Sequence, residues 1–436
     1  MARAMKVCVF EGQSPENLFP LTLTRPTFEL RCGRTTLREK ILAGSRETDV
    51  CYFMRGYLAP VYENKYQRQP INQIRFLKTD DFFLVNGKWL RRKRDALHQG
   101  DEIVTTSGDE VVYAKVKRNT LTKNLASDLE ETLRRLRKDL GETPIDATLI
   151  SYPWHPVLCN AEAIRDDFQS IRGGINGKVS PMAAIEGPED QLYVADTAEV
   201  HPFVTLETAG GPIIIEHGAK IYPHSRIEGP ASIGRETYVY EAKIRPGSTL
   251  GPVCRVGGEV DESIFHGHSN KHHEGFLGHS YVGEWVNLGA LTTNSDLKND
   301  YTTVQVYVQG KLVDTGETKV GSYFGDHVKT SIGCLLTTGA VLGVMSNVLA
   351  TGEVAPKLIP SFTWYFRNKF SRGLGLRRMI DTAETVMARR NVIMSQEEKV
   401  LFQHLYEITR DERDKIIKKS RMKARLSRRK NDEGIG

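Results

Sequence analysis

Five of the chain's twelve histidines gather in residues 264–299, which makes this the segment with the most chemistry to offer. An imidazole can take a proton from an amine or a hydroxyl at neutral pH, and it can also ligate zinc. The segment therefore predicts either a general base or a zinc centre. The zinc alternative would use two residues of one strand, which should face the same side, and a third from beyond the next turn. The five histidines are His266, His268, His272, His273 and His279.

Lysines and asparagines accompany these histidines. Lys271 and Lys298 are placed to bind phosphate as point charges, although a solvated lysine is the alternative for each of them alone. Asn287 and Asn294 follow within the same segment. The residue types therefore suit a small phosphorylated substrate that carries an amine or a hydroxyl.

Two strings of this segment resemble the acetyltransferase half of the bifunctional UDP-N-acetylglucosamine pyrophosphorylase / glucosamine-1-phosphate N-acetyltransferases. The strings are His273-Glu274-Gly275-Phe276-Leu277-Gly278 and Val286-Asn287-Leu288-Gly289-Ala290. The family carries Asn-His-Leu-Thr-Tyr-Leu-Gly and Val-Asn-Ile-Gly-Ala-Gly-Thr at the same offset. Two residues depart from that pattern, since His272 replaces its asparagine and Phe276 its tyrosine.

The resemblance implies a role for several residues. His273 would deprotonate the sugar amine that attacks acetyl-CoA, and Asn287 would be an active-site asparagine. Asn294 lies near the position of the family's second active-site asparagine, with a spacing that differs by one residue. The sugar phosphate would be contacted by Lys271, His272 and Lys298. A general base needs no metal, and zinc ligands in β-helical carbonic anhydrases are spread over adjacent coils. We therefore expect metal-free acyl transfer here.

A wider resemblance, over roughly residues 5–410, is to a branch of sugar nucleotidyltransferases related to glucosamine-1-phosphate acetyltransferases. It rests on PLTLTRPTFELRCG, VNGKWL, YPW and PKLIPSFTW as well as the histidine segment. It implies a second reaction, nucleotidyl transfer from UTP or dTTP to a sugar 1-phosphate. Arg25 and Lys40 would hold the nucleotide phosphates, with structural ion pairs as the alternative.

The N-terminal half departs from the nucleotidyltransferase pattern at two places. The Gly-x-Gly-Thr-Arg-Met core that should follow the first strand is missing, and Lys88 stands in the segment where a magnesium-binding aspartate is expected. Magnesium at this site therefore rests on the resemblance, with Asp80, Asp81 and Asp109 as substitute ligands. The alternative is that only one half is a catalyst and the other is a degenerate binding or regulatory module.

The element that must position the histidines is indicated by a six-residue apolar repeat. An α-helix cannot keep that spacing on one face, but a solenoid with triangular coils requires it. Glycines that follow the repeated aliphatic residues suit tight corners. We predict a left-handed parallel β-helix. The repeat runs through Ile215, Ile221, Ile227, Ile233, Val239, Ile244, Leu250, Val256, Phe276, Val282, Leu288, Phe324, Thr330, Leu336, Leu342, Val348 and Val354.

Three regions follow from these patterns. Residues 1–190 mix strand-like and helical runs in an α/β pattern, with a helix capped by Ser127. Residues 191–360 form the β-helix, from which residues 294–319 leave as a hairpin that turns at Gln309-Gly310. Residues 361–436 add helices, one of them capped by Ser395, that cover the open end of the solenoid.

The bulk composition is that of an ordinary soluble globular protein. Six scattered cysteines without a CxxC pair fit reduced thiols, and no segment is apolar enough for a signal peptide or a membrane span, so we expect a cytoplasmic protein. Nine Lys or Arg residues and no acid lie between Lys415 and Lys430, a tail that we interpret as solvated rather than as a nucleic-acid site. The resemblance implies a homotrimer.

Overall fold

The computed structural model describes residues 5–43, 45–46, 49–95, 97–98, 102–171 and 173–433, with side chains up to residue 423. The rest of the predicted basic tail therefore has only its backbone, up to residue 433, within the described residues. The chain divides into two compact units. Unit 1 comprises Met1–Leu18, Thr24–Arg31 and Thr35–Tyr152, and unit 2 comprises Phe19–Leu23, Cys32–Arg34 and Pro153–Gly436. This division falls before the boundary expected near residue 190.

Unit 1 is built on a six-stranded sheet with strand order β4-β1-β5-β7-β6-β8. The central strand β1 pairs in parallel with β4 and β5, whereas β7 is antiparallel to both β5 and β6. The three parallel strands β1, β4 and β5 are largely buried apolar runs, as the parallel part of a sheet requires. The strands are β1 (Lys6–Phe10), β4 (Val50–Phe53), β5 (Phe82–Asn86), β6 (Ile103–Ser107), β7 (Glu110–Val116) and β8 (Thr143–Pro144).

Four helices complete unit 1: α1 (Leu37–Ile41), α2 (Ala59–Lys65), α3 (Arg118–Asn124) and α4 (Leu129–Leu140). The predicted capping residue of α4 was wrong by one position. Asp128, not Ser127, is the N-cap, and its side chain accepts a hydrogen bond from the backbone N–H of Glu131. An aspartate also adds negative charge at the positive end of the helix dipole.

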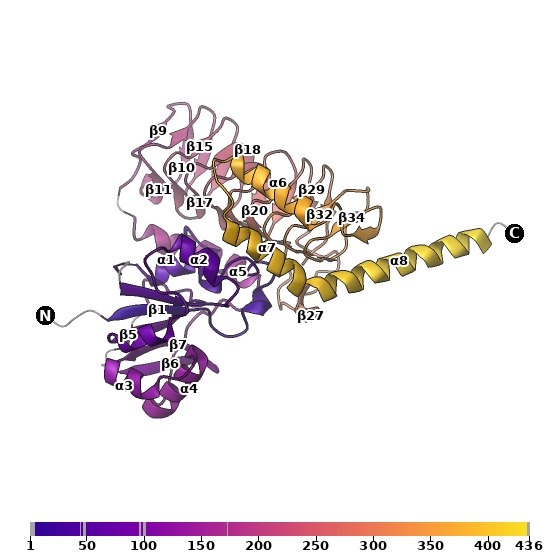
Figure 1. The fold of residues 1–436 in the computed structure, drawn as a ribbon. Coiled ribbons are helices and arrows are strands. Elements are labelled where there is room, and N and C mark those ends of the chain that lie inside the picture. Colours follow the sequence, from indigo (N-terminus) through magenta and orange to yellow (C-terminus); the bar gives the residue numbers. More distant parts are fainter. Residues whose placement is uncertain are drawn as a thin grey trace. The chain divides into compact units, whose positions relative to one another are not determined.

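Unit 2 is a parallel β-solenoid whose coils stack strand upon strand (Figure 1). One face is a nine-stranded sheet in which every pairing is parallel, with order β11-β14-β17-β19-β21-β24-β28-β31-β33. The six-residue repeat fills the interior, and the predicted fold class is confirmed. The strands of this face are β11 (Leu192–Val194), β14 (Ile213–Ile215), β17 (Ala231–Ile233), β19 (Ser248–Leu250), β21 (Ile264–Gly267), β24 (Tyr281–Glu284), β28 (Tyr323–Phe324), β31 (Val341–Leu342) and β33 (Leu358–Ile359).

The other two faces share strands, because β18 and β20 bend across a corner and serve both. One face contains β9 (Lys178–Val179), β12 (Glu199–Val200), β15 (Lys220–Ile221), β18 (Tyr238–Ile244), β20 (Arg255–Asp261), β22 (Asn270–Lys271), β29 (Lys329–Thr330), β32 (Asn347–Val348), β34 (Trp364–Phe366) and β35 (Lys369–Ser371). The other contains β10 (Ala184–Glu186), β13 (Thr205–Glu207), β16 (Arg226–Glu228), β23 (Phe276–Gly278), β25 (Thr293–Asn294) and β30 (Leu335–Leu336).

The repeat was predicted one residue out of step at two places. Leu277, not Phe276, lies in the core, because it pairs with the inward Val260 of the coil before. Val354 is exposed, while Ala355 is buried. The first slip arises because the coil side from Leu277 to Val282 is five residues long, and the second because the side from Val348 to Ala355 is seven residues long.

The repeated glycines serve a different purpose from the one predicted. None of Gly234, Gly251, Gly257 and Gly289 has a positive φ. A Cβ at Gly251 would instead lie 2.1 Å from the carbonyl oxygen of His266 in the next coil, and one at Gly257 2.2 Å from that of His272. The glycines therefore let neighbouring coils approach, and the corners with positive φ are occupied by larger residues such as Val253 and His268.

The hairpin and the C-terminal helices follow the prediction. Strands β26 (Gln305–Val308) and β27 (Lys311–Asp314) pair antiparallel around Gln309-Gly310. Ser395 and Glu398 form a capping box at the start of α7. A ring contact ties α7 to the solenoid, since the ring centroids of Phe402 and His327 lie 5.4 Å apart. The unit 2 helices are α5 (His155–Phe168), α6 (Leu376–Ala388), α7 (Gln396–Ile408) and α8 (Arg410–Glu433). Across the described residues, no helix combines the length and apolarity needed to cross a bilayer.

Candidate active sites

His273 follows β22 at a corner of the solenoid, where its side chain is exposed. Its ring meets that of His272 edge to face, with centroids 4.8 Å apart, and His272 in turn lies 4.3 Å from Tyr240 of an earlier coil. In the described part of the chain, the ring nitrogens of His273 make no hydrogen bond. A lone pair is therefore open to a substrate that arrives from solvent, as a general base requires.

The pKa of the neighbouring His272 is lowered. Partial burial is the main cause, and the nearby His273 and Arg255 lower it further.

Lys271 points inward, at a position where neighbouring coils place Val256 and Leu288. It is 1% exposed. Its ammonium donates to the carbonyl oxygens of Gly257, at 2.8 Å, and His273, at 3.3 Å. Burial lowers its pKa to about 8. In this arrangement Lys271 braces the backbone of His273 and does not face solvent.

The three remaining predicted residues of the histidine segment have different surroundings from His273. Asn287 is exposed, and its backbone bridges Asn270 and Lys329. Asn294 is buried, and its amide both accepts from the N–H and donates to the carbonyl of Gly278, so it links coils. Lys298 is half-buried, 3.8 Å from Asp300. Among the described residues no contact joins these three side chains to His273.

The histidines of the zinc alternative do not converge. His266 Nδ1 lies 2.9 Å from the hydroxyl of Tyr281, whereas the His268 ring stacks on Trp285 with centroids 4.3 Å apart. The prediction that both share a face was wrong, because His268 lies beyond the end of β21 at a corner with φ of 53°. A corner reverses the alternation that holds within a strand.

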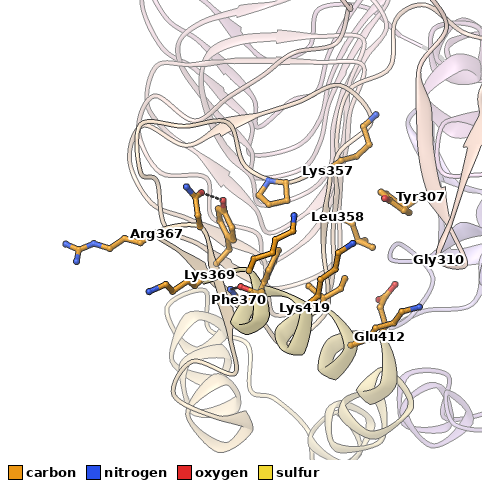
Figure 2. A pocket seen from close by; sticks show the side chains of 16 residues that line it. Tyr307, Gly310, Lys357, Leu358, Arg367, Lys369, Phe370, Glu412 and Lys419 are labelled. Atoms are coloured by element: carbon orange, nitrogen blue, oxygen red, sulfur yellow. Dashed lines mark hydrogen bonds between the residues drawn. The ribbon is translucent and has the colours of Figure 1, made fainter. Parts of the chain in front are cut away.

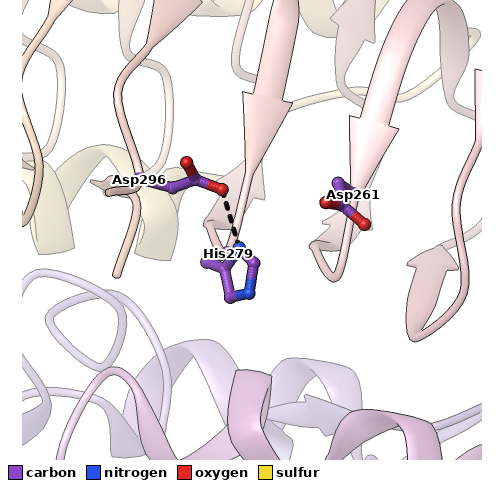
Figure 3. Close-up of side chains that lie close together, drawn as sticks. All are labelled: Asp261, His279 and Asp296. Carbon is purple, nitrogen blue, oxygen red and sulfur yellow. Dashed lines mark hydrogen bonds and ion pairs between the residues drawn. The ribbon is translucent and has the colours of Figure 1, made fainter. Parts of the chain in front are cut away.

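A different group, Asp261, His279 and Asp296, is the one in the described residues that places three possible metal ligands within 4.8 Å (Figure 3). His279 Nδ1 lies 2.8 Å from Asp296, and its Nε2 lies 3.3 Å from Glu262. Burial works against its charge, but hydrogen bonds to both carboxylates raise its pKa to about 9. The two carboxylates thus favour the imidazolium form of His279, and in this form the group is an ion-pair cluster. Sequence reasoning missed Asp261 and Asp296, which are far apart in the chain.

Unit 1 contains a cavity of about 720 Å³. It is lined by Glu11–Glu16 after β1, by Phe53–Arg55 after β4, and by residues of β7 and α4. In an open α/β sheet, ligands bind beyond the carboxyl ends of parallel strands, where the strand order reverses. The order β4-β1-β5 places that reversal at β1, so this cavity is the candidate nucleotide site.

The buried charges of this cavity are already paired. Arg55 Nη2 lies 2.6 Å from Glu11 Oε1, and Lys88 Nζ lies 2.7 Å from Glu110 Oε2. The Glu11 carboxylate also accepts from the backbone N–H groups of Thr27 and Arg55. The position that would hold a glycine-rich loop is therefore braced by ion pairs. Sequence reasoning missed Glu11 and Arg55, because neither belongs to a motif.

The predicted nucleotide-binding residues do not line this cavity. Arg25 is buried, with its carbonyl oxygen accepting from Arg55 Nη2 at 3.0 Å, and Lys40 is half-buried on α1. Asp80, Asp81 and Asp109 also lie outside the lining. Within the described ranges, no three carboxylates, histidines or cysteines of the cavity come together as metal ligands. The residues present thus do not fit magnesium in the predicted way.

Comparison with known proteins identifies the N-terminal part. Residues 7–175 match the family model described as sugar nucleotidyl transferase. A bifunctional sugar-1-phosphate nucleotidylyltransferase/acetyltransferase of Sulfurisphaera tokodaii is 33% identical over 149 residues, which are 31% of this chain and 37% of that protein. The bifunctional protein GlmU of Cupriavidus pinatubonensis is 24% identical over 267 residues, 57% of this chain and 55% of that protein. The chain thus spans between about a third and just over half of the length of these relatives.

Among solved structures, the Arabidopsis UDP-N-acetylglucosamine acyltransferase is 13% identical with a TM-score of 0.20, over 56% of this chain and 93% of that one. The N-acyltransferase AntD of Bacillus cereus, solved with dTDP and 3-hydroxybutyryl-CoA, is 11% identical with a TM-score of 0.21, over 49% of this chain and 87% of that one. The sequence relatives confirm the expected resemblance to bifunctional nucleotidyltransferase/acetyltransferases, and the match to the sugar nucleotidyl transferase model lies in residues 7–175.

Proposed function

We propose that the chain is a two-site sugar-nucleotide transferase. Unit 2 transfers the acetyl group of acetyl-CoA to the amine of glucosamine 1-phosphate. Unit 1 joins the N-acetylated sugar 1-phosphate to UTP or dTTP and releases pyrophosphate. The similarity to bifunctional relatives supports the pairing of the two reactions.

The acetyl transfer is supported by one observation. The imidazole of His273 is exposed and makes no hydrogen bond among the described residues, on a backbone that Lys271 braces. In this reaction His273 takes a proton from the sugar ammonium, and the freed amine attacks the thioester carbonyl. The attacking nitrogen loses its second proton to solvent, the C–S bond breaks, and coenzyme A leaves as a thiolate that takes the first proton back from His273. Asn287 and backbone N–H groups polarise the carbonyl, while Lys298 and His272 contact the sugar phosphate. Asn294 and Lys271 act from inside the coil, by holding the backbone.

The test is release of coenzyme A thiol by the full chain with acetyl-CoA and glucosamine 1-phosphate. His273→Ala should lower kcat by about 10²- to 10⁴-fold, the usual contribution of a general base. His224→Ala is the matched control, because His224 is an exposed corner histidine whose ring stacks on Phe203 outside this segment. No turnover in the unaltered chain, or full turnover in His273→Ala, would remove the assignment.

The nucleotidyl transfer is supported by the family match and by the cavity beyond β1. Arg25 and Lys40 remain predicted nucleotide-binding residues that would have to act from outside the lining. Magnesium also remains a prediction, and no step is assigned to it here. Pyrophosphate release, measured with UTP and dTTP against several sugar 1-phosphates, tests this half.

A specific observation favours a second candidate for unit 1, a degenerate module that binds without catalysis. The ion pairs Glu11–Arg55 and Lys88–Glu110 occupy positions where a catalytic loop and a metal ligand are expected. This candidate predicts nucleotide binding without pyrophosphate release. Release with any pair of substrates would exclude it.

The assembly and location are part of the same proposal. The homotrimer implied by the resemblance would be measured by sedimentation of the full chain. A cytoplasmic location is compatible with six free cysteines, five of them buried. The expected partners are acetyl-CoA, a sugar 1-phosphate and a nucleoside triphosphate.

A further inference from the structure

The largest cavity described in unit 2, of about 870 Å³, lies at the capped end of the solenoid and takes no part in the reactions above. Its walls come from three places: the turn of the β26–β27 hairpin, the last coil with the β34–β35 hairpin, and one face of α8 (Figure 2). A cavity of this size suits a nucleotide or a cofactor of similar bulk.

Positive charge dominates the lining. Lys357 comes from the last coil, Lys369 from β35, and Lys415, Lys419 and Lys423 from α8, while Glu412 is the one acidic residue. Lys357 and Lys419 extend from opposite walls in Figure 2. As far as the described residues extend, Lys357, Lys369, Lys415 and Lys419 form no ion pair. Other exposed cations of the solenoid do have acidic partners, as Arg226 has in Glu207 and Glu228.

This clustering costs stability unless an anion binds. Lys415 and Lys419 are four residues apart on α8, so their charges repel on one helix face. Lys357 donates to the carbonyl oxygen of Gln305 at 2.7 Å, and burial, followed by the charge of Lys298, lowers its pKa. Several ammonium groups held around one space are an arrangement that phosphates neutralise.

The floor between these charges is aromatic and fixed. The rings of Tyr365 and Phe370 lie 5.0 Å apart. The Tyr365 hydroxyl donates to Asn368, and the backbone N–H of Phe370 donates to Ser420 of α8 at 3.1 Å. The polar groups of the floor are thus occupied within the protein. Tyr365 is 5% exposed and belongs to the solenoid core, so the half-buried ring of Phe370 is the one left to pack against a planar base.

We propose that this pocket binds a nucleotide, with its phosphates between Lys357, Lys369, Lys415 and Lys419 and its base against Phe370. Two sources supply this chemistry, a nucleoside triphosphate and the phosphorylated adenosine end of coenzyme A. The proposal stands apart from catalysis, because it concerns binding at a place where neither His273 nor the unit 1 cavity lies.

The experiment is calorimetric titration of the full chain with coenzyme A, dephospho-coenzyme A, UTP, ATP and inorganic triphosphate. The double variant Lys415→Gln/Lys419→Gln should weaken nucleotide binding at one site by at least tenfold. Lys418→Gln is the matched control, because Lys418 is exposed on the same helix but outside the lining. Both variants lie on an exposed helix face, and equal unfolding temperatures would establish that each one folds.

The titrated ligands distinguish the two possible sources of the nucleotide, coenzyme A and a nucleoside triphosphate. Tighter binding of coenzyme A than of dephospho-coenzyme A or ATP, lost in the double variant, identifies coenzyme A. Loss of one of two UTP or ATP sites in that variant identifies a nucleoside triphosphate, while the other site reports unit 1. Three results would overturn the proposal. The double variant could bind every nucleotide as tightly as the unaltered chain, or Lys418→Gln could lose as much affinity as the double variant. The third is that inorganic triphosphate binds as tightly as every nucleotide. These readouts need no turnover, so they stand or fall separately from the proposed reactions.

Discussion

Replacing Lys271 by methionine should make the protein more stable at neutral pH. The lysine is buried among aliphatic residues, and its pKa falls from 10.5 to about 8. A methionine of similar length leaves that interior position uncharged. The substitution therefore removes the free-energy cost of burying an ammonium group, a cost that applies only to the charged form of the lysine.

The magnitude follows from the pKa difference. Because the folded-state pKa is lowered, the penalty is fully present below about pH 8 and disappears as the pH rises through 10.5. A shift of this size corresponds to roughly 3 kcal/mol at pH 7 and to roughly 1 kcal/mol at pH 10. Methionine loses the hydrogen bonds to the carbonyl oxygens of Gly257 and His273, about 1 kcal/mol each, at both pH values. The pH dependence therefore isolates the ionisation.

The assay is urea unfolding of the unaltered chain and Lys271→Met at pH 7 and pH 10. Between these values the unaltered chain should gain roughly 2 kcal/mol relative to the variant. Lys243→Met provides the control, because Lys243 lies outward and exposed on β18, and should show no such change. If the stability difference between Lys271→Met and the unaltered chain is the same at both pH values, Lys271 is not a buried ammonium and the argument is refuted.

Three further changes test other features. Because the pKa of His279 is raised to about 9, its ion pairs stabilise the fold fully below pH 6.5 and lose that effect as the pH rises through 9. In urea unfolding, His279→Gln should therefore lower the free energy of unfolding by roughly 3 kcal/mol more at pH 6 than at pH 9.5. A cost that does not depend on pH would contradict the ion-pair cluster. Arg55→Met leaves the buried Glu11 carboxylate unpaired and should destabilise unit 1 by roughly 3–5 kcal/mol, seen as faster proteolysis within residues 35–152, whereas unchanged proteolysis would argue against the pair. Gly257→Ala forces a Cβ against the carbonyl of His272 and should lower both the unfolding temperature and acetyl transfer, while Gly174→Ala, which meets nothing within 4 Å, should change neither; equal effects would mean that coil spacing is not the reason for Gly257.

The fold could be predicted because the solenoid repeats its signal. Each coil side places one aliphatic residue inward, so an error at a single coil, such as Phe276 for Leu277, does not change the inferred architecture. The hairpin turn at Gln309-Gly310 and the Ser395 cap were predictable for a similar reason, since each is set by a few adjacent residues. Ser127 was preferred to Asp128 because both are good N-caps and the pattern does not separate neighbours.

The sites were less predictable, because they depend on which way a side chain points. A lysine in a histidine-rich segment suggests phosphate binding, and nothing local reveals that Lys271 falls on the inward row. Asn294 is hidden in the same way, since its amide replaces an interior aliphatic residue and bonds to the coil before. The pairs Glu11–Arg55 and His279–Asp296 join residues far apart in the chain, and one sequence alone carries no record of such contacts.

The stacked coils also fix distances along the solenoid in equal steps. Asn270, Asn287, Lys329, Asn347 and Trp364 occupy the same row, one coil after another, and strands in register are about 4.8 Å apart. The coil of His273 and the coil that ends at the β34–β35 hairpin are thus separated by four steps, roughly 19 Å. Lengthening or shortening the solenoid by one whole coil would change that separation only in such increments while leaving the residues at each end intact. The distance between these two coils is therefore set by the number of coils that separate them. A series of coil insertions and deletions would measure how far a bound molecule can extend along the solenoid.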